Sequence, residues 1–419
     1  MIHSCGPRTL ALLTSGHVCS WDDACAEIQP KTESIERLTN PCGPNQTSEE
    51  IGSDSILELI VCLRTGTHII VTRSGRIYVG LLGNKVMRDI TSVVCETLGK
   101  GIDEVAEICI DRFTIIARTE DSIGIIRIQS APQVFSNDAN FDITGFSPYL
   151  HTFTSSINLI SFSFGRGFIR TDDGCLYFIS KIYYSWGTDS EPQLVGIDYA
   201  VHIHEIICCS RHTLLLINDG TVRTRSLASE NDPYSGFFSK VEFPKGVRIA
   251  RIVVNSIQVF YITTEGLCYY TDGGSDMILI RALQGYSVEN MFSVPEHMAV
   301  LHDKGRVCLL RMSRIIRGFP LDTTYVPRDR IEIDPAHRDG SEPPIDLLFF
   351  DDKGIVAVIQ AHSRTYFTSD DGSVYCATIN AHTIEQTIER IPFFDTNPIA
   401  IKNSIMRIRS AANMIEPST

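Results

Sequence analysis

The sequence lacks any apolar run that could cross a membrane as a helix, because no window approaches the roughly eighteen uninterrupted apolar residues required. Its first residues also lack the charged and then apolar layout of a secretory signal peptide. Its 13 cysteines have no paired spacing, and their odd number suits reduced thiols better than a disulfide framework. These absences predict a soluble intracellular protein in the cytoplasm, with the nucleus left open and no membrane insertion.

Basic residues are fewer than acidic residues in this sequence. The chain has 37 Lys and Arg against 50 Asp and Glu, a formal net charge of −13. Proteins that grip nucleic acid draw their affinity from clustered Lys and Arg. The composition therefore argues against a direct nucleic-acid partner and favours a basic one. Helical periodicity of useful length is absent as well, which excludes a solenoid of helix pairs.

What the sequence does contain is one hairpin pattern repeated eight times. Each copy is a β-rich run, a polar turn and a second β-rich run, and in seven copies the turn contains a glycine, which supplies the positive φ that such turns need. The turn glycines are Gly16, Gly75, Gly174, Gly220, Gly266, Gly305 and Gly372. In the remaining copy, third along the chain, Asp121 stands at the turn position. Two residues after each turn position the sequence predicts a buried residue: Val18, Ile77, Ile123, Leu176, Val222, Cys268, Val307 and Val374.

The spacing of the copies predicts the fold class. Successive turn positions are 59, 46, 53, 46, 46, 39 and 67 residues apart, and periods near forty to fifty are typical of propellers and repeat arrays. A further apolar run precedes several hairpins, at 57–63, 204–210, 249–255 and 355–361. With an outer strand, each repeat has the four strands of one propeller blade. We therefore expect an all-β chain that forms a single closed β-propeller over residues 1–419.

The two ends of the chain suggest how such a ring closes. The tail at 398–415 reads like the leading strands of a repeat without its turn, whereas the hairpin at 5–21 has little in front of it. Propellers commonly close by pairing the two ends in one blade. The sequence thus predicts that 398–415 closes the ring with 5–21.

Two of the copies carry a family resemblance. The stretches "CGPRTLALLTSGHVCSW" (5–21) and "CCSRHTLLLINDGTV" (208–222) resemble the repeat of the regulator of chromosome condensation family, although its Gly-Gln-Leu-Gly segment is missing and "NDPYSGFF" (231–238) is the nearest trace of it. The resemblance implies a seven-bladed propeller, whereas eight hairpin copies allow eight blades. It also implies either binding of protein partners or guanine-nucleotide exchange on a small GTPase.

No arrangement of residues stands out as catalytic. The acidic pairs Asp172-Asp173 and Asp370-Asp371 lie at repeat turns, where aspartate is favoured because it caps the local backbone, so we prefer that interpretation to acid–base chemistry. The cluster His202, His204, Cys208, Cys209 and His212 has metal-ligand residue types, but no second ligand pair stands at zinc spacing, and we favour core packing. The segment "LGKGIDE" (98–104) lacks the spacing of a phosphate loop. No catalytic, metal or cofactor site is expected.

Two insertions between blades, at 22–56 and 313–350, interrupt the regular spacing of the hairpin repeat. The first has eight acidic and two basic residues and is either a solvated, disordered loop or a docking surface for a basic partner. Around the start of the second, residues 311–330 have five arginines, two aspartates and several aromatic residues, the combination typical of interface hot spots. Packing against the propeller's side is the alternative. The candidate partner-binding residues are Arg314, Arg317, Phe319, Tyr325, Arg328 and Arg330.

The sequence therefore predicts a non-catalytic β-propeller scaffold that binds protein partners, alone or as a subunit of a larger assembly. The alternative is a guanine-nucleotide exchange factor for a small GTPase, and a propeller enzyme is the third and weakest candidate. Fold-level kinship alone decides none of these.

Overall fold

A computed structural model gives the structure of the chain, which divides into two compact units, Met1–Cys208 with Thr396–Thr419 and Cys209–Asp395. The structure describes residues 2–5, 8–23, 28, 30–33, 56–61, 67–81, 87–111, 114–130, 143–163, 165–179, 191–208, 212–226, 238–255, 258–271, 277–294, 297–311, 345–347, 350, 353–360, 364–379 and 386–400.

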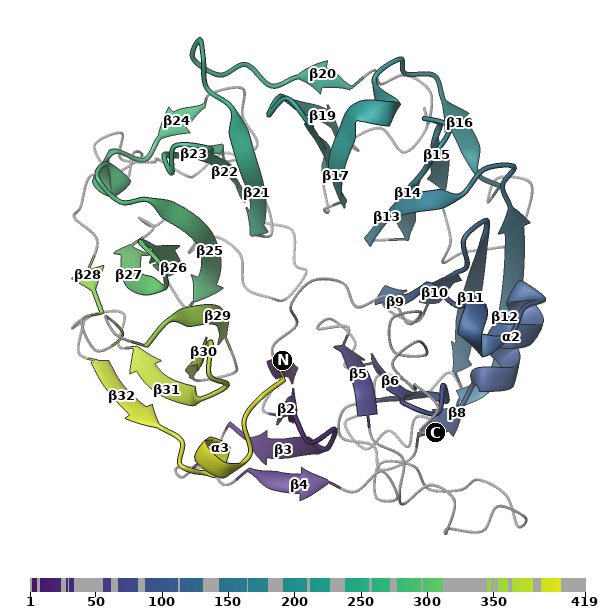
Figure 1. Cartoon of the computed structure of the whole chain (residues 1–419), viewed down its shortest axis with the longest axis horizontal. Coiled ribbons are helices and arrows are strands. Elements are labelled where there is room, and N and C mark those ends of the chain that lie inside the picture. The colour runs from purple at the N-terminus through teal and green to yellow at the C-terminus, as the bar shows by residue number, and fades with distance from the viewer. Residues whose placement is uncertain are drawn as a thin grey trace, which may run out of the picture. The chain divides into compact units, whose positions relative to one another are not determined.

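The described strands form eight antiparallel sheets, each built from four strands that are consecutive in the sequence (Figure 1). The first two sheets contain β1 (Ile2–Cys5), β2 (Arg8–Leu12), β3 (Val18–Asp22) and β4 (Lys31–Glu33), then β5 (Ile56–Val61), β6 (Thr67–Thr72), β7 (Ile77–Leu81) and β8 (Arg88–Asp89). The next two contain β9 (Glu107–Asp111), β10 (Thr114–Arg118), β11 (Ser122–Ser130) and β12 (Ile143–Thr152), then β13 (Ile157–Ser163), β14 (Arg166–Thr171), β15 (Leu176–Ile179) and β16 (Gln193–Val195).

The remaining four sheets follow the same plan. The fifth and sixth contain β17 (Ile203–Cys208), β18 (His212–Ile217), β19 (Val222–Ser226) and β20 (Ser239–Lys240), then β21 (Ile249–Asn255), β22 (Gln258–Thr263), β23 (Cys268–Thr271) and β24 (Ile278–Leu279). The last two contain β25 (Val288–Val294), β26 (His297–His302), β27 (Arg306–Arg311) and β28 (Ile345–Asp346), then β29 (Ile355–Gln360), β30 (Thr365–Ser369), β31 (Val374–Ile379) and β32 (Gln386–Arg390).

This strand order is that of a β-propeller, and each sheet is one blade. The eight hairpin copies correspond one to one to the second and third strands of the eight sheets. The fold class predicted from the repeat is confirmed. The described residues form eight blades, the number that the eight hairpin copies allowed, and not the seven that the family resemblance implied.

The repeat turns have the backbone geometry that their glycines allow. All seven turn glycines have φ between 78° and 92°. In six of these turns, the glycine N–H donates to the carbonyl three residues earlier, as from Gly266 to Thr263 at 3.0 Å. Asp121 instead ends a two-residue loop, closed by the bond from Thr119 N–H to Ser122 O at 2.9 Å. The turn without glycine therefore has a shorter loop.

The Gly305 turn is different, because two non-glycine residues precede the glycine with positive φ. Asp303 has φ of 44° and Lys304 has φ of 69°. Such angles are costly for residues with a Cβ atom, and local hydrogen bonds offset the cost. Lys304 N–H donates to the Glu289 carboxylate at 2.7 Å, and Ser287 N–H donates to the Asp303 carboxylate at 3.2 Å.

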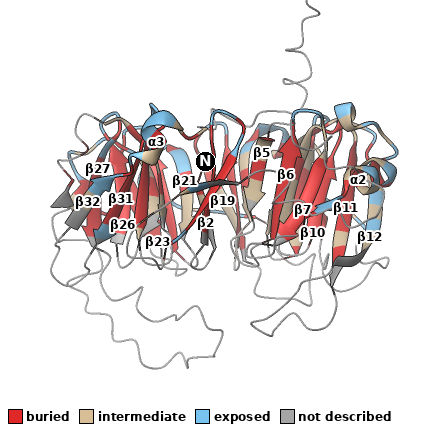
Figure 2. Ribbon diagram, turned by 90° about the horizontal axis from the view of Figure 1, so that it is seen from below, coloured by how far each residue is buried: buried red, intermediate tan, exposed pale blue. Residues whose placement is uncertain are grey.

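Buried residues run along the strands of both units (Figure 2), and apolar clusters join successive sheets within each unit. In the first unit Ile69 and Ile77 pack with Ile115 and Ile126. In the second unit Phe260, Met291, Met298 and Cys308 form an equivalent cluster. The eight positions that follow the turns by two residues are all buried, at 2% exposure or less. Strand β6 is buried along its whole length, with Ile69 and Val71 in one core and Ile70 in another, so both faces of this hairpin lie in cores.

One helix, which the hairpin repeat does not predict, interrupts the strand pattern. Helix α2 (Thr91–Leu98) packs on β11 and β12 and ends at Gly99, which has φ of 62°. Gly101 then precedes the short 3-10 helix η1 (Ile102–Glu104). The glycines of "LGKGIDE" thus end one helix and begin another. Further short helices are η3 (Ala200–His202), η4 (Arg281–Leu283) and α3 (Phe393–Thr396). None of the helices in the described ranges combines the length and apolar character that a membrane crossing requires.

The N-terminal sheet has four strands, β1 to β4, without any strand from the C-terminal tail. The expectation that the hairpin at 5–21 lacks strands which the tail would supply is therefore wrong. Strand β1 pairs with β2, from Ile2 opposite Ala11 to Cys5 opposite Arg8. Residues near the C-terminus nevertheless bond to this sheet: Thr14 N–H donates to Pro398 O and Ala400 N–H donates to Leu12 O, both at 2.9 Å. That 398–415 closes a ring with 5–21 stays a prediction, because residues 401–419 lie outside the described residues.

The two insertions are shorter than the ranges 22–56 and 313–350. Strand β4 lies inside the first range, and Ile56 is a buried residue of β5. Strand β28 lies inside the second, and Phe350 is fully buried. Both ranges therefore include parts of blades.

Candidate functional site

The predicted partner-binding residues cannot be placed in a site. Arg314, Arg317, Phe319, Tyr325, Arg328 and Arg330 all lie outside the described residues, between β27 and β28. Their role in partner binding stays a prediction. The described residues instead bring together a different set of polar groups.

The paired aspartates at the turns are engaged in local hydrogen bonds. The Thr171 hydroxyl donates to Asp173 at 2.6 Å and the Ser369 hydroxyl donates to Asp371 at 2.5 Å. These bonds lower the pKa of both carboxyls below the usual range, so both are ionised at neutral pH. Asp351 and Asp352 lie outside the described residues.

The His and Cys cluster does not gather around a metal position in the part of the chain that the structure describes. His202 belongs to η3 rather than to β17, so it does not share a strand with His204. The Cys208 thiol donates to Ser161 O at 3.4 Å. Cys209 lies outside the described residues.

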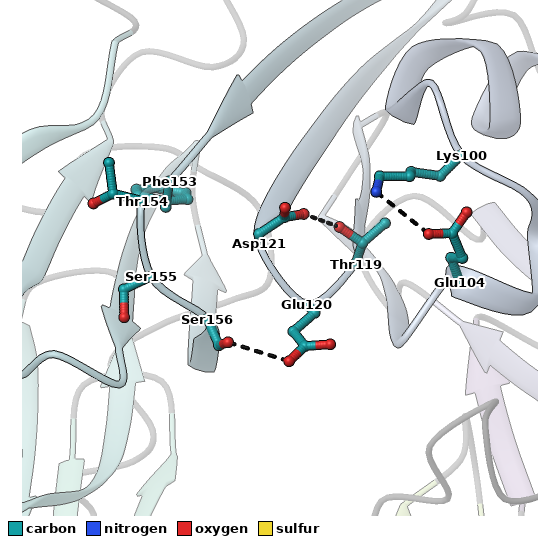
Figure 3. Close-up of a pocket in the computed structure, with 9 residues that line it drawn as sticks. All are labelled: Lys100, Glu104, Thr119, Glu120, Asp121, Phe153, Thr154, Ser155 and Ser156. Carbon is teal, nitrogen blue, oxygen red and sulfur yellow. Dashed lines mark hydrogen bonds and ion pairs between the residues drawn. The ribbon is translucent and has the colours of Figure 1, made fainter.

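A polar pocket of about 270 Å³ lies in the first unit, at the β10–β11 turn (Figure 3). Three segments that are distant in the sequence line it: the end of the α2–η1 region, the turn itself, and the residues that directly follow β12. The lining residues are Lys100, Glu104, Thr119, Glu120, Asp121, Phe153, Thr154, Ser155 and Ser156.

The pocket's acidic groups form an ion pair and hydrogen bonds with neighbouring residues. Lys100 Nζ lies 3.3 Å from the Glu104 carboxylate, and the Ser156 hydroxyl donates to Glu120 at 3.3 Å. Hydroxyls of Ser122 and Thr119 each donate to Asp121 at 3.0 Å. These two bonds hold the pKa of Asp121 below its usual range, so the pocket wall carries a fixed negative charge at neutral pH.

The same acidic surface continues to the next repeat turn. Asp172 N–H donates to Ser156 O at 2.8 Å, and Asp173 N–H donates to the Ser155 hydroxyl at 3.2 Å. The Asp172-Asp173 turn therefore adjoins the pocket wall. We call the carboxylates of Glu104, Glu120, Asp121, Asp172 and Asp173 the acidic surface.

The size and chemistry of the pocket indicate what it can accept. Pockets for drug-sized ligands have volumes of roughly 300–1,000 Å³, so this one suits a single side chain better than a cofactor. Three lining carboxylates stand against one lysine, and two more belong to the adjoining Asp172-Asp173 turn, which favours a cationic group. Hydroxyls of Thr154, Ser155 and Ser156 offer further polar contacts.

Two arginines that join neighbouring sheets were not among the residues predicted to be functional. Arg118, at the end of β10, donates from Nε to the Glu107 carboxylate and from Nη1 to Ile157 O, both at 2.9 Å. Arg170, at the end of β14, donates in the same way to Asn158 and to Ile203 O. The signal was an arginine directly before the turn threonine, in "IIART" and "GFIRT". We call Arg118 and Arg170 the clasp arginines.

Strand order and site together define a β-propeller with an acidic surface at its repeat turns. No family model matches the chain, and no curated protein matches it either. Among solved structures it is similar to Kluyveromyces lactis Hsv2, with a TM-score of 0.49 and 12% identity over 81% of this chain and 98% of that one.

Two further structures show a comparable degree of similarity. Prp20p from Saccharomyces cerevisiae has a TM-score of 0.43 and 10% identity over 80% of this chain and 83% of that one. Human WBSCR16 has a TM-score of 0.42 and 10% identity over 68% and 82%. Such weak likenesses carry no functional argument, and the fold assignment rests on the strand order itself.

Proposed function

We propose that this chain is a non-catalytic β-propeller that binds protein partners. The observation that carries the proposal is the acidic surface: the carboxylates of Glu104, Glu120 and Asp121 line a pocket of side-chain size, and the Asp172-Asp173 turn adjoins it. The aspartates at these turns are used for local hydrogen bonds and for surface charge rather than for proton transfer. A surface of this kind binds basic groups of another protein by charge complementarity.

The basic segment at 311–330 is the second partner contact that we propose, with Arg314, Arg317 and Phe319 at its centre. Replacing these three residues together by alanine should weaken binding of native partners by roughly 2 kcal/mol, the range of a hot-spot cluster. The midpoint of thermal unfolding should change little, since surface substitutions are usually worth within about 0.5 kcal/mol each. Affinity capture with the unmodified chain and the triple variant, compared by quantitative mass spectrometry, measures the first quantity. A lowered melting midpoint with full partner retention would show that the segment packs on the blades instead.

Nucleotide exchange is the alternative implied by the family resemblance. Prp20p has been studied for its binding to Gsp1p and histones. We expect no acceleration of nucleotide release from a small nuclear GTPase by this chain, since none of its loops can be matched to an exchange wedge. Release of a fluorescent guanine nucleotide, followed with and without the chain, measures this. Catalysed release at sub-micromolar concentrations would replace the scaffold proposal.

A further inference from the structure

Strand β12 differs from the fourth strand of every other sheet. It has 10 residues, whereas β4, β8, β16, β20, β24, β28 and β32 have between 2 and 5. It pairs with β11 on one side, and no described strand pairs with its other side. A long unpaired edge is a template for another strand, which is why natural proteins keep such edges short.

The backbone direction along β12 follows from two observations. Pro148 lies opposite Ile126, and a proline is tolerated in a ladder where its nitrogen faces away from the neighbouring strand. Phe153 N–H donates inward, to Asp121 O at 2.8 Å. Directions alternate along a strand, so Leu150 and Thr152 present their N–H and C=O groups to the open edge.

The side chains near this end of β12 are accessible. Leu150 is 43% exposed, among the few large apolar side chains exposed in the described part of the chain. On the opposite face of the strand, His151 packs edge-on against Phe153, with ring centroids 4.6 Å apart, and Phe153 does the same with Tyr177 at 4.8 Å. Phe153 also lines the pocket. The open edge of β12 therefore ends beside the pocket, and Phe153 connects the aromatic residues to the pocket wall.

We propose that an extended segment of a partner protein adds to β12 as an antiparallel strand, with a basic side chain at its N-terminal end in the pocket. Antiparallel addition is the commoner pairing and brings the partner's N-terminal residues to the end of β12 at Thr152, next to the pocket. Main-chain bonds to Leu150 and Thr152 hold the segment, and the acidic surface selects its charge. This inference rests on the proposed function and names the partner's chemistry.

A labelled peptide, Arg-Arg-Gly-Val-Thr-Val-Thr-Val, is the probe, and its binding to the full chain is followed by fluorescence anisotropy. Leu150→Pro removes one outward N–H and should weaken binding by about tenfold, whereas Leu150→Ala keeps that donor and should cost about twofold. Glu120→Gln should weaken binding by about threefold. Glu242→Gln, an exposed acid of the second unit, is the matched control and should leave binding unchanged.

Hydrogen exchange supplies a second readout on the unmodified chain. The amides of Leu150 and Thr152 should become protected when the peptide is added, and this measurement decides alone if Leu150→Pro does not fold. Equal binding by all variants, or no protection at β12, would overturn the inference. So would a peptide-free dimer that Leu150→Pro converts to a monomer, because the occupant would then be a second copy of the chain.

Capture of native partners separates this inference from the proposed function. Partners that are retained in full by Leu150→Pro and Glu120→Gln would overturn the β12 site and leave the scaffold proposal in place. Failure of the unmodified chain to hold any partner would overturn the scaffold proposal itself.

Discussion

Replacing Gly266 by alanine should lower the free energy of unfolding by roughly 3 kcal/mol. Two costs combine. The residue has φ of 78°, where a Cβ atom meets its own backbone, and that Cβ would also lie 2.9 Å from Ser287 Cα at the start of the next sheet. The next sheet cannot retreat freely, because Val288 N–H donates to Gly266 O at 3.2 Å.

Gly246→Ala is the matched control for this prediction. Gly246 lies in the same unit and has φ of 88°, but apart from its own chain neighbours no residue has an atom within 4 Å of the position its Cβ would take. Only the backbone cost remains, about 1 kcal/mol. Urea unfolding of both variants against the unmodified chain measures the difference. Equal losses would show that the approach of the next sheet imposes no constraint on the turn.

The hairpin repeat was predictable because its signal is local. A turn glycine and a buried apolar residue two positions later, as at Gly220 and Val222, lie close together in the sequence and can be recognised there. Their physical causes, positive φ and the two-residue period of a strand, act over the same few residues. The register of the eight hairpins therefore follows from the local pattern of the eight copies alone.

The pocket in the first unit was not predictable, because the residues that line it come from separate parts of the chain. Lys100 follows a helix of only eight residues, which is too short to show a clear periodicity. The residues at the two ends of this helix, Asp89, whose carboxylate accepts from Thr91 N–H, and the C-cap Gly99, are of types that are common in turns as well. Nothing in the sequence shows that Lys100, Glu120 and Ser156 line one pocket, since only the packing of successive sheets brings them together.

The clasp arginines escaped the sequence analysis for a related reason. In a strand of alternating residues an arginine is expected to face solvent, yet the side chain of Arg118 is only 7% exposed. Its second partner, Ile157 O, lies 39 residues further along the chain. An arginine before a turn therefore joins its own sheet to the next one, which the local pattern cannot show.

Arg118→Met should destabilise the chain by roughly 3 kcal/mol, because the change leaves a carboxylate and a carbonyl without their donor in a largely buried place. The double variant Arg118→Met with Glu107→Leu should recover more than half of that loss, since an apolar pair often replaces a buried ion pair at little cost. Arg170→Met is the comparison and should cost only about 1–2 kcal/mol, because its side-chain partner Asn158 is neutral. Urea unfolding of the four proteins gives these values. A double variant no more stable than Arg118→Met alone would place the effect in the bond to Ile157 O, and the joining of two sheets, rather than the neutralised charge, would then be what Arg118 contributes.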